Sequence, residues 1–190
     1  MIPIKDEIPT HRFPVVNYLL IAANIIVFIL MWLAGPGQES LVYQFAMIPT
    51  NYFNGINLGD ISDIFTSMFM HGGWMHIIGN MWFLIVFADN VEDAMGPFRF
   101  LVFYILCGAA AAAAQTISGP DSTIPMVGAS GAIGGVMGAY LRLYPRAPVH
   151  MLVILGFYVS RVAVPAFFML GYWFLLQLLS GAVDKGMGGV

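Results

Sequence analysis

Long apolar runs separated by short polar stretches dominate the chain. A helix that crosses a bilayer needs about 20 mostly apolar residues. Five runs approach or exceed that length, and they predict transmembrane helices at residues 14–34, 61–88, 97–117, 127–144 and 162–182. The further apolar stretch 149–159 has two interpretations. It is either a loop at the membrane interface, which the nearby Arg161 favours, or an extension of the fifth helix.

The composition supports a membrane protein. Hydrophobic residues make up 59% of the 190 residues and charged residues only 9%, with a mean hydropathy of +0.83. Soluble domains average about 45–50% apolar and about 25% charged residues. The prediction is therefore an all-α, polytopic membrane protein of one domain. The first run is too long for a cleaved signal peptide and is expected to be retained. A net charge of −3 without a basic cluster argues against nucleic acid.

The positive residues predict the orientation. Cytoplasmic segments of membrane proteins carry an excess of Lys and Arg. A cytoplasmic N-terminus puts six of the seven positive residues inside and leaves only Lys185 outside. The six are Lys5, Arg12, Arg99, Arg142, Arg146 and Arg161. The N-terminus is therefore expected in the cytoplasm.

Polar residues interrupt the second apolar run. The stretch FMHGGWMHIIGNMWFL, residues 69–84, contains His71, His76 and Asn80. In one continuous helix, His76 and Asn80 are four residues apart and share a face. His71 lies five residues before His76, so it is expected to point elsewhere and to lie nearer the outer surface. Polar residues inside a membrane indicate a functional site by default.

Ser130 is expected at a similar depth. It lies 12 residues before Arg142, or about 18 Å along the helix, whereas His76 lies 13 residues before Asp89, or about 20 Å. A serine at a helix start presents its hydroxyl and a free backbone N–H to a ligand. Together with donors from His76 and Asn80, it would form the oxyanion hole that acyl transfer needs.

Other interpretations of these residues stay open at this stage. Ser130 is also a small residue in a packing face, because Gly131 and Gly135, like Gly134 and Gly138, have the spacing of close helix contacts. His76 and Asn80 are also suited to structural hydrogen bonds between helices. A metal site is disfavoured, since His71 and His76 do not share a helix face and no HExxH motif is present.

The combination of motifs resembles the rhomboid intramembrane serine proteases. The matching residues are H-x4-H-x3-N at positions 71–80, the G-x-S-G motif at 128–131, VEDAMGPFRFL at 91–101 and VPAFFMLGYWFLLQLLSG at 164–181. The resemblance covers the chain from about Phe13 to its end. It implies that residues 1–190 form one rhomboid-like domain that cleaves peptide bonds in or near transmembrane segments of substrate proteins. No cofactor or metal is implied, and the setting is the lipid bilayer, with a bacterial cytoplasmic membrane expected.

The resemblance also implies roles for single residues. Ser130 is the nucleophile, and His76, Asn80 and the Ser130 backbone N–H hold the oxyanion. Gly128 shapes the turn before the serine, and His71 has an oxyanion or water-binding role. Glu92 is structural and forms hydrogen bonds in a loop on the cytoplasmic side. The glycines after Ser130 let the fourth helix pack against a sixth.

The general base of the family is missing from this sequence. The family places a histidine on a sixth helix, and no histidine follows His150 here. The preferred interpretation is a C-terminally incomplete protease domain. The alternative is a catalytically inactive relative that binds transmembrane helices as a chaperone or adaptor. A small-solute transporter fits less well, because no predicted helix centre carries a charged residue.

Overall fold

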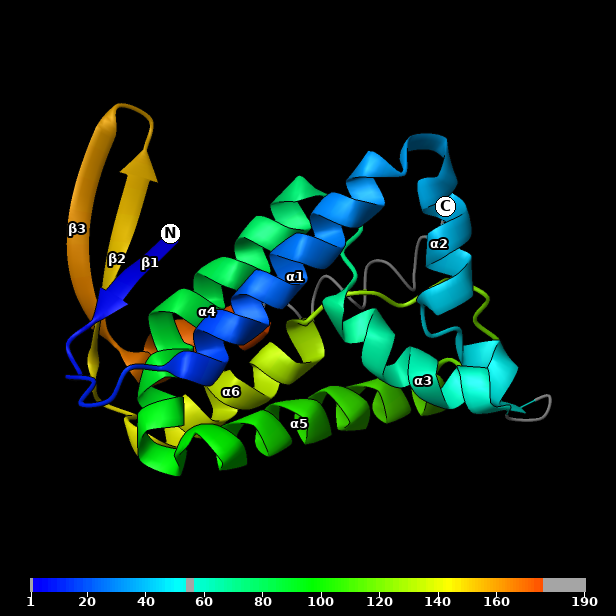
Figure 1. Ribbon diagram of the computed structural model, residues 1–190. Helices are drawn as coiled ribbons and strands as arrows, with labels where there is room; N and C mark the ends of the chain where they lie inside the picture. Colours follow the sequence, from blue (N-terminus) through cyan, green and yellow to red (C-terminus); the bar gives the residue numbers. More distant parts are fainter. Residues whose placement is uncertain (1, 54–56, 176–190) are drawn as a thin grey trace.

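The computed structural model describes residues 2–53 and 57–175 (Figure 1). The helices are α1 (Val15–Leu33), α2 (Gln38–Phe45), α3 (Leu58–Thr66), α4 (Trp74–Met95), α5 (Pro97–Ser118), α6 (Ser130–Leu143) and a last helix at Ala166–Leu175. Short 3-10 helices lie at Gly35–Gly37 (η1), Pro49–Phe53 (η2) and Ser67–Phe69 (η3). Strands β1 (Ile2–Asp6), β2 (Pro148–Leu155) and β3 (Tyr158–Pro165) form one antiparallel sheet in the order β1-β2-β3.

Two of the five predicted spans are long apolar helices in the structure. By length and composition, α1 and α5 could each cross a membrane, and they match the predicted segments 14–34 and 97–117. The predicted segment 127–144 becomes α6, whose 14 residues span only about 21 Å. The predicted fifth segment is described as a helix only over Ala166–Leu175, and its remaining residues 176–182 lie outside the described part of the chain.

The predicted single helix 61–88 is wrong. Helix α3 ends at Thr66, η3 follows, and α4 begins only at Trp74. Between them lie Gly72 and Gly73, two adjacent residues that disfavour helix. Helix α4 then continues seven residues past the predicted end, to Met95. It stops at Gly96, whose φ of +81° suits glycine, and Pro97 opens α5 at a position that needs no N–H.

The stretch 149–159 is neither a loop nor helix. It lies in the antiparallel hairpin β2–β3, and the all-α prediction is wrong to this extent. Leu155 pairs with Tyr158, so the turn is the two residues Gly156 and Phe157, with Gly156 at φ +60°. Glycine at the first turn position between runs of strand-forming residues is a known hairpin signal. Strand β1 at the N-terminus then adds to β2, and no pattern had predicted this pairing.

Helix α6 packs closely on α5 through glycine. A Cβ atom built on Gly131 would lie 2.4 Å from Cβ of Ala111, and one on Gly135 would lie 2.3 Å from Sγ of Cys107. Both contacts are too close for any side chain, so this glycine pair packs against α5. The resemblance implied that the glycines after Ser130 pack against a sixth helix, and for Gly131 and Gly135 the observed partner is α5 instead. Gly134 and Gly138 differ, because among the described residues nothing lies within 4 Å of their Cβ positions.

Glu92 joins α4 to the start of α1. Its side chain is 3% exposed, and its carboxylate accepts hydrogen bonds from the backbone N–H groups of Val16 at 3.0 Å and Asn17 at 2.7 Å. These N–H groups lie in the first turn of α1 and have no partner within that helix. The predicted structural role is therefore supported by hydrogen bonds, although Glu92 belongs to α4 and not to a loop.

Candidate active site

A tight turn places Ser130 at the first position of α6. Gly128 has a φ of +123°, a conformation that side chains rarely adopt, and its N–H donates to the Ser67 carbonyl at 2.9 Å. Two residues earlier, the Met126 N–H donates to the Met47 carbonyl at 2.8 Å. The segment before the serine is therefore held by backbone contacts with two distant parts of the chain.

The same turn packs against α4. A Cβ atom on Gly128 would lie 2.7 Å from both Cε1 and Nε2 of His76 and 3.7 Å from Nδ2 of Asn80. The glycine therefore gives the His76 ring the space that a side chain would occupy, and the Asn80 amide lies at an ordinary contact distance from that position. The predicted proximity of the two motifs appears in the structure as this contact, two residues before Ser130.

His71 lies with His76 and Asn80 and does not point elsewhere, which corrects the sequence prediction. Its side chain is 0% exposed, its Nε2 lies 2.9 Å from Nδ2 of Asn80, and its ring centroid lies 5.0 Å from that of His76. The prediction failed because it assumed one continuous helix, whereas the chain turns between residues 70 and 73. With the amide oriented in this way, Nε2 of His71 is the acceptor, so His71 is neutral in this contact.

Asn80 has donor capacity left for a ligand. An amide NH₂ carries two hydrogens, and only one is used on His71. The backbone at the start of α6 also has free donors, since the first helical bond runs from the Ile133 N–H to the Ala129 carbonyl. The N–H groups of Ser130, Gly131 and Ala132 precede it and make no such bond. Both sets of donors suit a site that stabilises negative charge.

Ser130 is exposed and opens onto a small cavity. Its side chain forms no hydrogen bond with another described residue. The cavity has a volume of about 270 Å³ and lies between α3, α5 and the start of α6. Ser67, Gln115, Gly128 and Ser130 give it a partly polar lining. His76 and Asn80 do not line it, so they approach the serine turn from another side.

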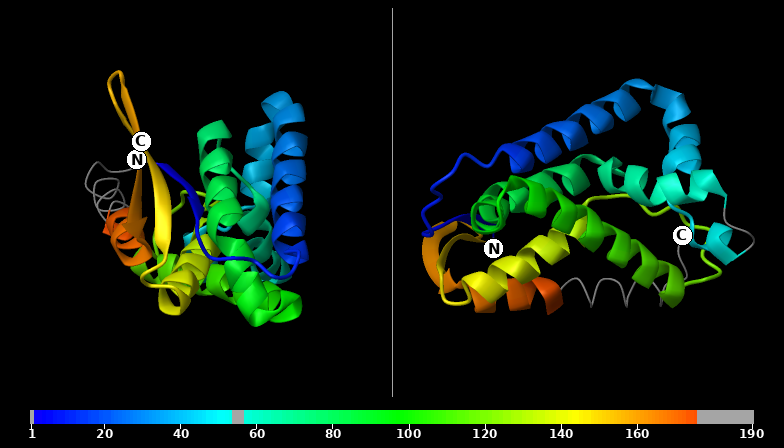
Figure 2. Two further views of the ribbon diagram at one scale, coloured as in Figure 1. Left: turned by 90° about the vertical axis from the view of Figure 1, so that its left-hand side faces the viewer. Right: turned by 60° about the horizontal axis from the view of Figure 1, so that its bottom comes forward.

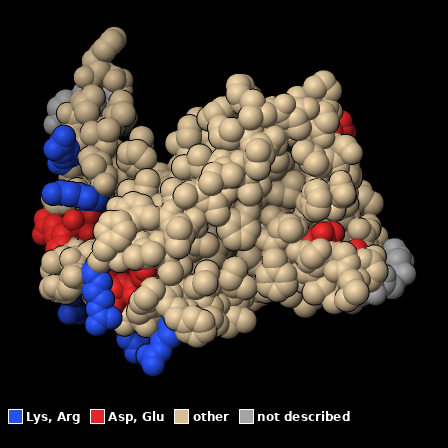
Figure 3. Space-filling view, viewed as in Figure 1, with Lys and Arg blue, Asp and Glu red and all other residues tan. Residues whose placement is uncertain are grey.

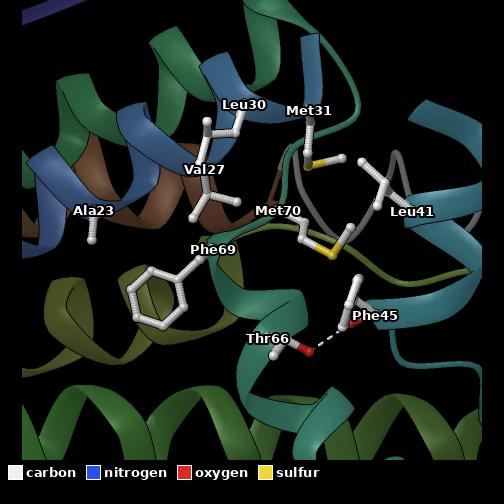
Figure 4. A pocket seen from close by; sticks show the side chains of 9 residues that line it. All are labelled: Ala23, Val27, Leu30, Met31, Leu41, Phe45, Thr66, Phe69 and Met70. Carbon is white, nitrogen blue, oxygen red and sulfur yellow. Dashed lines mark hydrogen bonds between the residues drawn. The ribbon is translucent and has the colours of Figure 1, made fainter. Parts of the chain in front are cut away.

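A larger cavity lies between α1, α2 and the α3–η3 segment. Its volume is about 470 Å³, and side chains of these helices point into it (Figure 4). The lining is apolar apart from Thr66, whose hydroxyl donates to the Phe45 carbonyl at 2.6 Å. Because that hydroxyl has already donated its only hydrogen, the cavity offers no side-chain donor to a peptide carbonyl. It is therefore not a candidate for the chemistry.

The remaining histidines lie at the opposite end of the bundle. His150, on β2, pairs with Glu7 at 2.7 Å, and the backbone N–H of His11 donates to Asp93 at 2.9 Å. Within residues 2–53 and 57–175, no histidine is hydrogen-bonded to Ser130. The same part of the chain holds no group of three His, Cys, Asp or Glu residues arranged for a metal ion.

Sequence reasoning missed the support for the serine turn. The Ser67 carbonyl and the Met47 backbone hold residues 126–128, yet neither residue lies in a recognisable motif. Both act through main-chain atoms, which any residue type would supply. No sequence signal would have identified them.

Comparison with known proteins identifies the family. A family model described as the Rhomboid domain matches residues 58–188, so the chain belongs to the rhomboid family. The family implies a polytopic helical membrane fold and, at the family level, intramembrane proteolysis.

The chain is also similar to individual rhomboid proteins. The chain is 29% identical over 129 residues to the putative rhomboid protease YdcA of Bacillus subtilis (strain 168), covering 68% of this chain and 62% of that protein. It is 30% identical over 128 residues to the rhomboid protease GluP of the same organism, covering 67% and 24%. It is 32% identical over 83 residues to rhomboid-like protease 5 of Toxoplasma gondii, covering 44% and 10%. The matched part is less than two thirds of each relative's length.

Proposed function

We propose that this chain carries the nucleophile and the oxyanion-binding groups of an intramembrane serine endopeptidase. The observation that carries the proposal is the contact of Gly128, two residues before Ser130, with His76 and Asn80. In the proposed site, the Ser130 hydroxyl and the N–H groups at the start of α6 act together with His76 and Asn80 of α4, which approach the turn at Gly128. Membership of the rhomboid family supports the same reaction class.

The proposed reaction is acyl transfer to Ser130 followed by hydrolysis. Oγ of Ser130 attacks the carbonyl carbon of the scissile peptide bond, and the hydroxyl proton passes to a general base. The Ser130 N–H, His76 and Asn80 hold the resulting oxyanion. The tetrahedral intermediate collapses, the C–N bond breaks, and the amine leaves with a proton from the base. Water then hydrolyses the acyl ester and restores the serine.

The general base is proposed to come from a histidine on a further helix, as the resemblance implies. A serine hydroxyl is a weak nucleophile without such a base. The face of α6 that carries Gly134 and Gly138 supports this view, because nothing among the described residues lies within 4 Å of either Cβ position. Another helix can pack closely against this face, because glycine has no side chain.

The proposed substrates are transmembrane segments of other membrane proteins. The site is reached from the lipid bilayer, and water enters from the outer side. The proposed orientation keeps the N-terminus and the six positive residues in the cytoplasm, with a bacterial cytoplasmic membrane as the expected location.

Cleavage by the full-length protein tests this proposal. The Ser130→Ala variant, reconstituted in liposomes with model transmembrane substrates, is expected to give no detectable product while folding normally. Ser118→Ala, which removes a hydroxyl at the end of α5, is the matched control and should cleave at the wild-type rate. Unchanged cleavage by Ser130→Ala would overturn the proposal. Helix binding without cleavage by the wild-type protein would favour the inactive adaptor instead.

A further inference from the structure

The hairpin β2–β3 stands apart from the helix bundle. It starts at the end of the bundle where α1 begins, and it rises beside α1 and α4 (Figure 1 and the left view of Figure 2). Its base is buried through Val149 and Met151, which belong to the hydrophobic core. Ile154, Phe157 and Val159, nearer the turn, are exposed outside this core.

The outer part of the hairpin is apolar and exposed. Phe157 at the turn is fully exposed, and the paired residues Ile154 and Val159 are each more than half exposed. Arg161, opposite Leu152, is the charged residue nearest the turn. Exposed apolar surface of this kind marks contact with another apolar phase.

The hairpin also shares one face with two positive residues. Lys5 of β1 pairs with His150, and Arg161 of β3 pairs with Leu152, two residues further along β2. Paired residues in an antiparallel sheet lie on the same face, and so do residues two apart along a strand. Lys5, Arg161 and Ile154 therefore lie on one face, with the positive residues toward the base and the apolar residues toward the turn.

The acidic residues at this end of the molecule are hydrogen-bonded to groups other than Lys and Arg. Each of five carboxylates accepts a hydrogen bond from a neighbouring group: Asp6 from Tyr140, Glu7 from His150, Asp89 from Thr10, Glu92 from Val16 and Asn17, and Asp93 from His11. The positive residues Lys5, Arg12, Arg99, Arg142, Arg146 and Arg161 are exposed, and none forms a salt bridge with a described residue. Lys and Arg gather at this end in the space-filling view (Figure 3).

We infer that the β2–β3 hairpin is an anchor for the anionic surface of the inner membrane leaflet. The Phe157 turn inserts among the lipids just below the headgroups, and Lys5 and Arg161 bind the phosphates of anionic lipids. Positive residues beside an exposed apolar segment are the known requirement for such binding. The inference rests on membership of a membrane-protein family and the proposed cytoplasmic N-terminus. It does not depend on the proposed catalytic role.

Lipid fits this surface better than a water-soluble partner does. The hairpin runs beside the bundle, where the bilayer lies, instead of projecting away from the helix ends. Insertion is limited in depth, because within residues 2–53 and 57–175 no strand pairs with the outer edge of β3, and unpaired backbone groups are not stable in hydrocarbon. The turn therefore belongs at the interface and not at the bilayer centre.

A fluorescent label at the turn tests the inference in the full-length protein. With Cys107 replaced by serine, Phe157→Cys is labelled with the environment-sensitive dye NBD and reconstituted into vesicles of phosphatidylcholine, with or without phosphatidylglycerol. With phosphatidylglycerol, quenching by doxyl-labelled lipids should be several-fold stronger than quenching by iodide in the water. The combined Lys5→Gln and Arg161→Gln variant should reverse that preference. The matched control, Arg12→Gln with Arg99→Gln, loses the same charge outside the sheet and should not.

Three outcomes would overturn the inference. Strong iodide quenching in both kinds of vesicle, with little quenching by doxyl-labelled lipids, would place the turn in water. Protection from both quenchers would mean that a protein or a second copy of the chain covers it. Insertion that is unaffected by Lys5→Gln with Arg161→Gln would mean that headgroup binding by these two residues does not hold the hairpin.

Discussion

The two ends of the helix bundle use polar residues in opposite ways. At the Ser130 end, few polar groups lie among apolar helices, and several keep unused hydrogen-bonding capacity. The Ser130 hydroxyl forms no hydrogen bond within the described part of the chain, and Asn80 donates only one of its two amide hydrogens, to His71. The other end, where α1 begins and the exposed Lys and Arg residues gather, is called the Lys/Arg end. There the carboxylates accept hydrogen bonds from the protein, and the positive residues are exposed.

This difference separates residues that build the fold from residues available for chemistry or binding. Glu92 is as buried as a core residue, and both of its oxygens are satisfied by α1. Such a group stabilises the structure and has little left for a ligand. His76 is exposed beside Gly128, and its ring nitrogens form no hydrogen bond within the described part of the chain. Variants at the two ends should therefore affect different measurements.

The largest effect is expected on catalysis at the Ser130 end. His76→Ala and Asn80→Ala, each made in the full-length protein, should lower kcat by about 100- to 1000-fold, because each removes a donor to the oxyanion. The melting temperature should change little for His76→Ala, since the ring is exposed. His11→Ala, a histidine at the opposite end, is the control and should keep the wild-type rate. Unchanged kcat in both site variants would remove them from the oxyanion hole.

The next effect concerns how α6 is held against α5. Gly135→Ala should lower the free energy of unfolding by about 1–3 kcal/mol, because its new methyl group meets Cβ of Cys107 at 2.5 Å. Gly79→Ala on α4 is the matched control, since nothing described lies within 4 Å of that position. Unfolding in detergent, followed by circular dichroism, measures both. Equal stability of the two variants would show that the α5–α6 contact relaxes easily.

Glu92→Gln should test the Lys/Arg end without touching the chemistry. One amide oxygen cannot replace two carboxylate oxygens, so a buried N–H in the first turn of α1 loses its partner, at a cost of about 1–3 kcal/mol. The exposed Glu39→Gln on α2 should stay within about 0.5 kcal/mol of the wild type. The cleavage rate per folded molecule should not change. A fall in that rate at full folding would contradict a purely structural role.

The smallest effect is expected from the pH dependence of Asp6. Burial raises the pKa of the Asp6 carboxyl above its ordinary value, against the opposing effect of the hydrogen bond from Tyr140. Between the unfolded and folded pKa values, the folded chain holds the proton more tightly, so stability falls as the pH rises through that window. Asp6→Asn should lose this dependence. A wild-type advantage over Asp6→Asn that grows with pH from acid to neutral would contradict the sign.

Much of the bundle follows from the sequence because its signals are local. The long apolar runs predicted α1 and α5, because the length and hydropathy of a run are enough to indicate a possible membrane-spanning helix. The glycine spacing predicted a close contact of α6 through Gly131 and Gly135, since only glycine permits it. The G-x-S-G motif placed a serine at a helix start, and Ser130 is the first residue of α6. The residues that carry each signal lie within a few turns of one another, although the partners of the glycines, Ala111 and Cys107, come from α5.

Tertiary structure decided what depends on partners distant in the chain. The break at residues 70–73 turned His71 back toward Asn80, which a single-helix pattern could not show. The Ser67 and Met47 carbonyls accept hydrogen bonds from the main chain of the serine turn. Any residue type can supply a carbonyl, so the sequence does not indicate such contacts. The pairing of β1 with β2 joins residues nearly 150 positions apart in the sequence, so only the folded chain reveals it. The sequence determined which groups are available for the proposed reaction, and the tertiary contacts decided which of them meet.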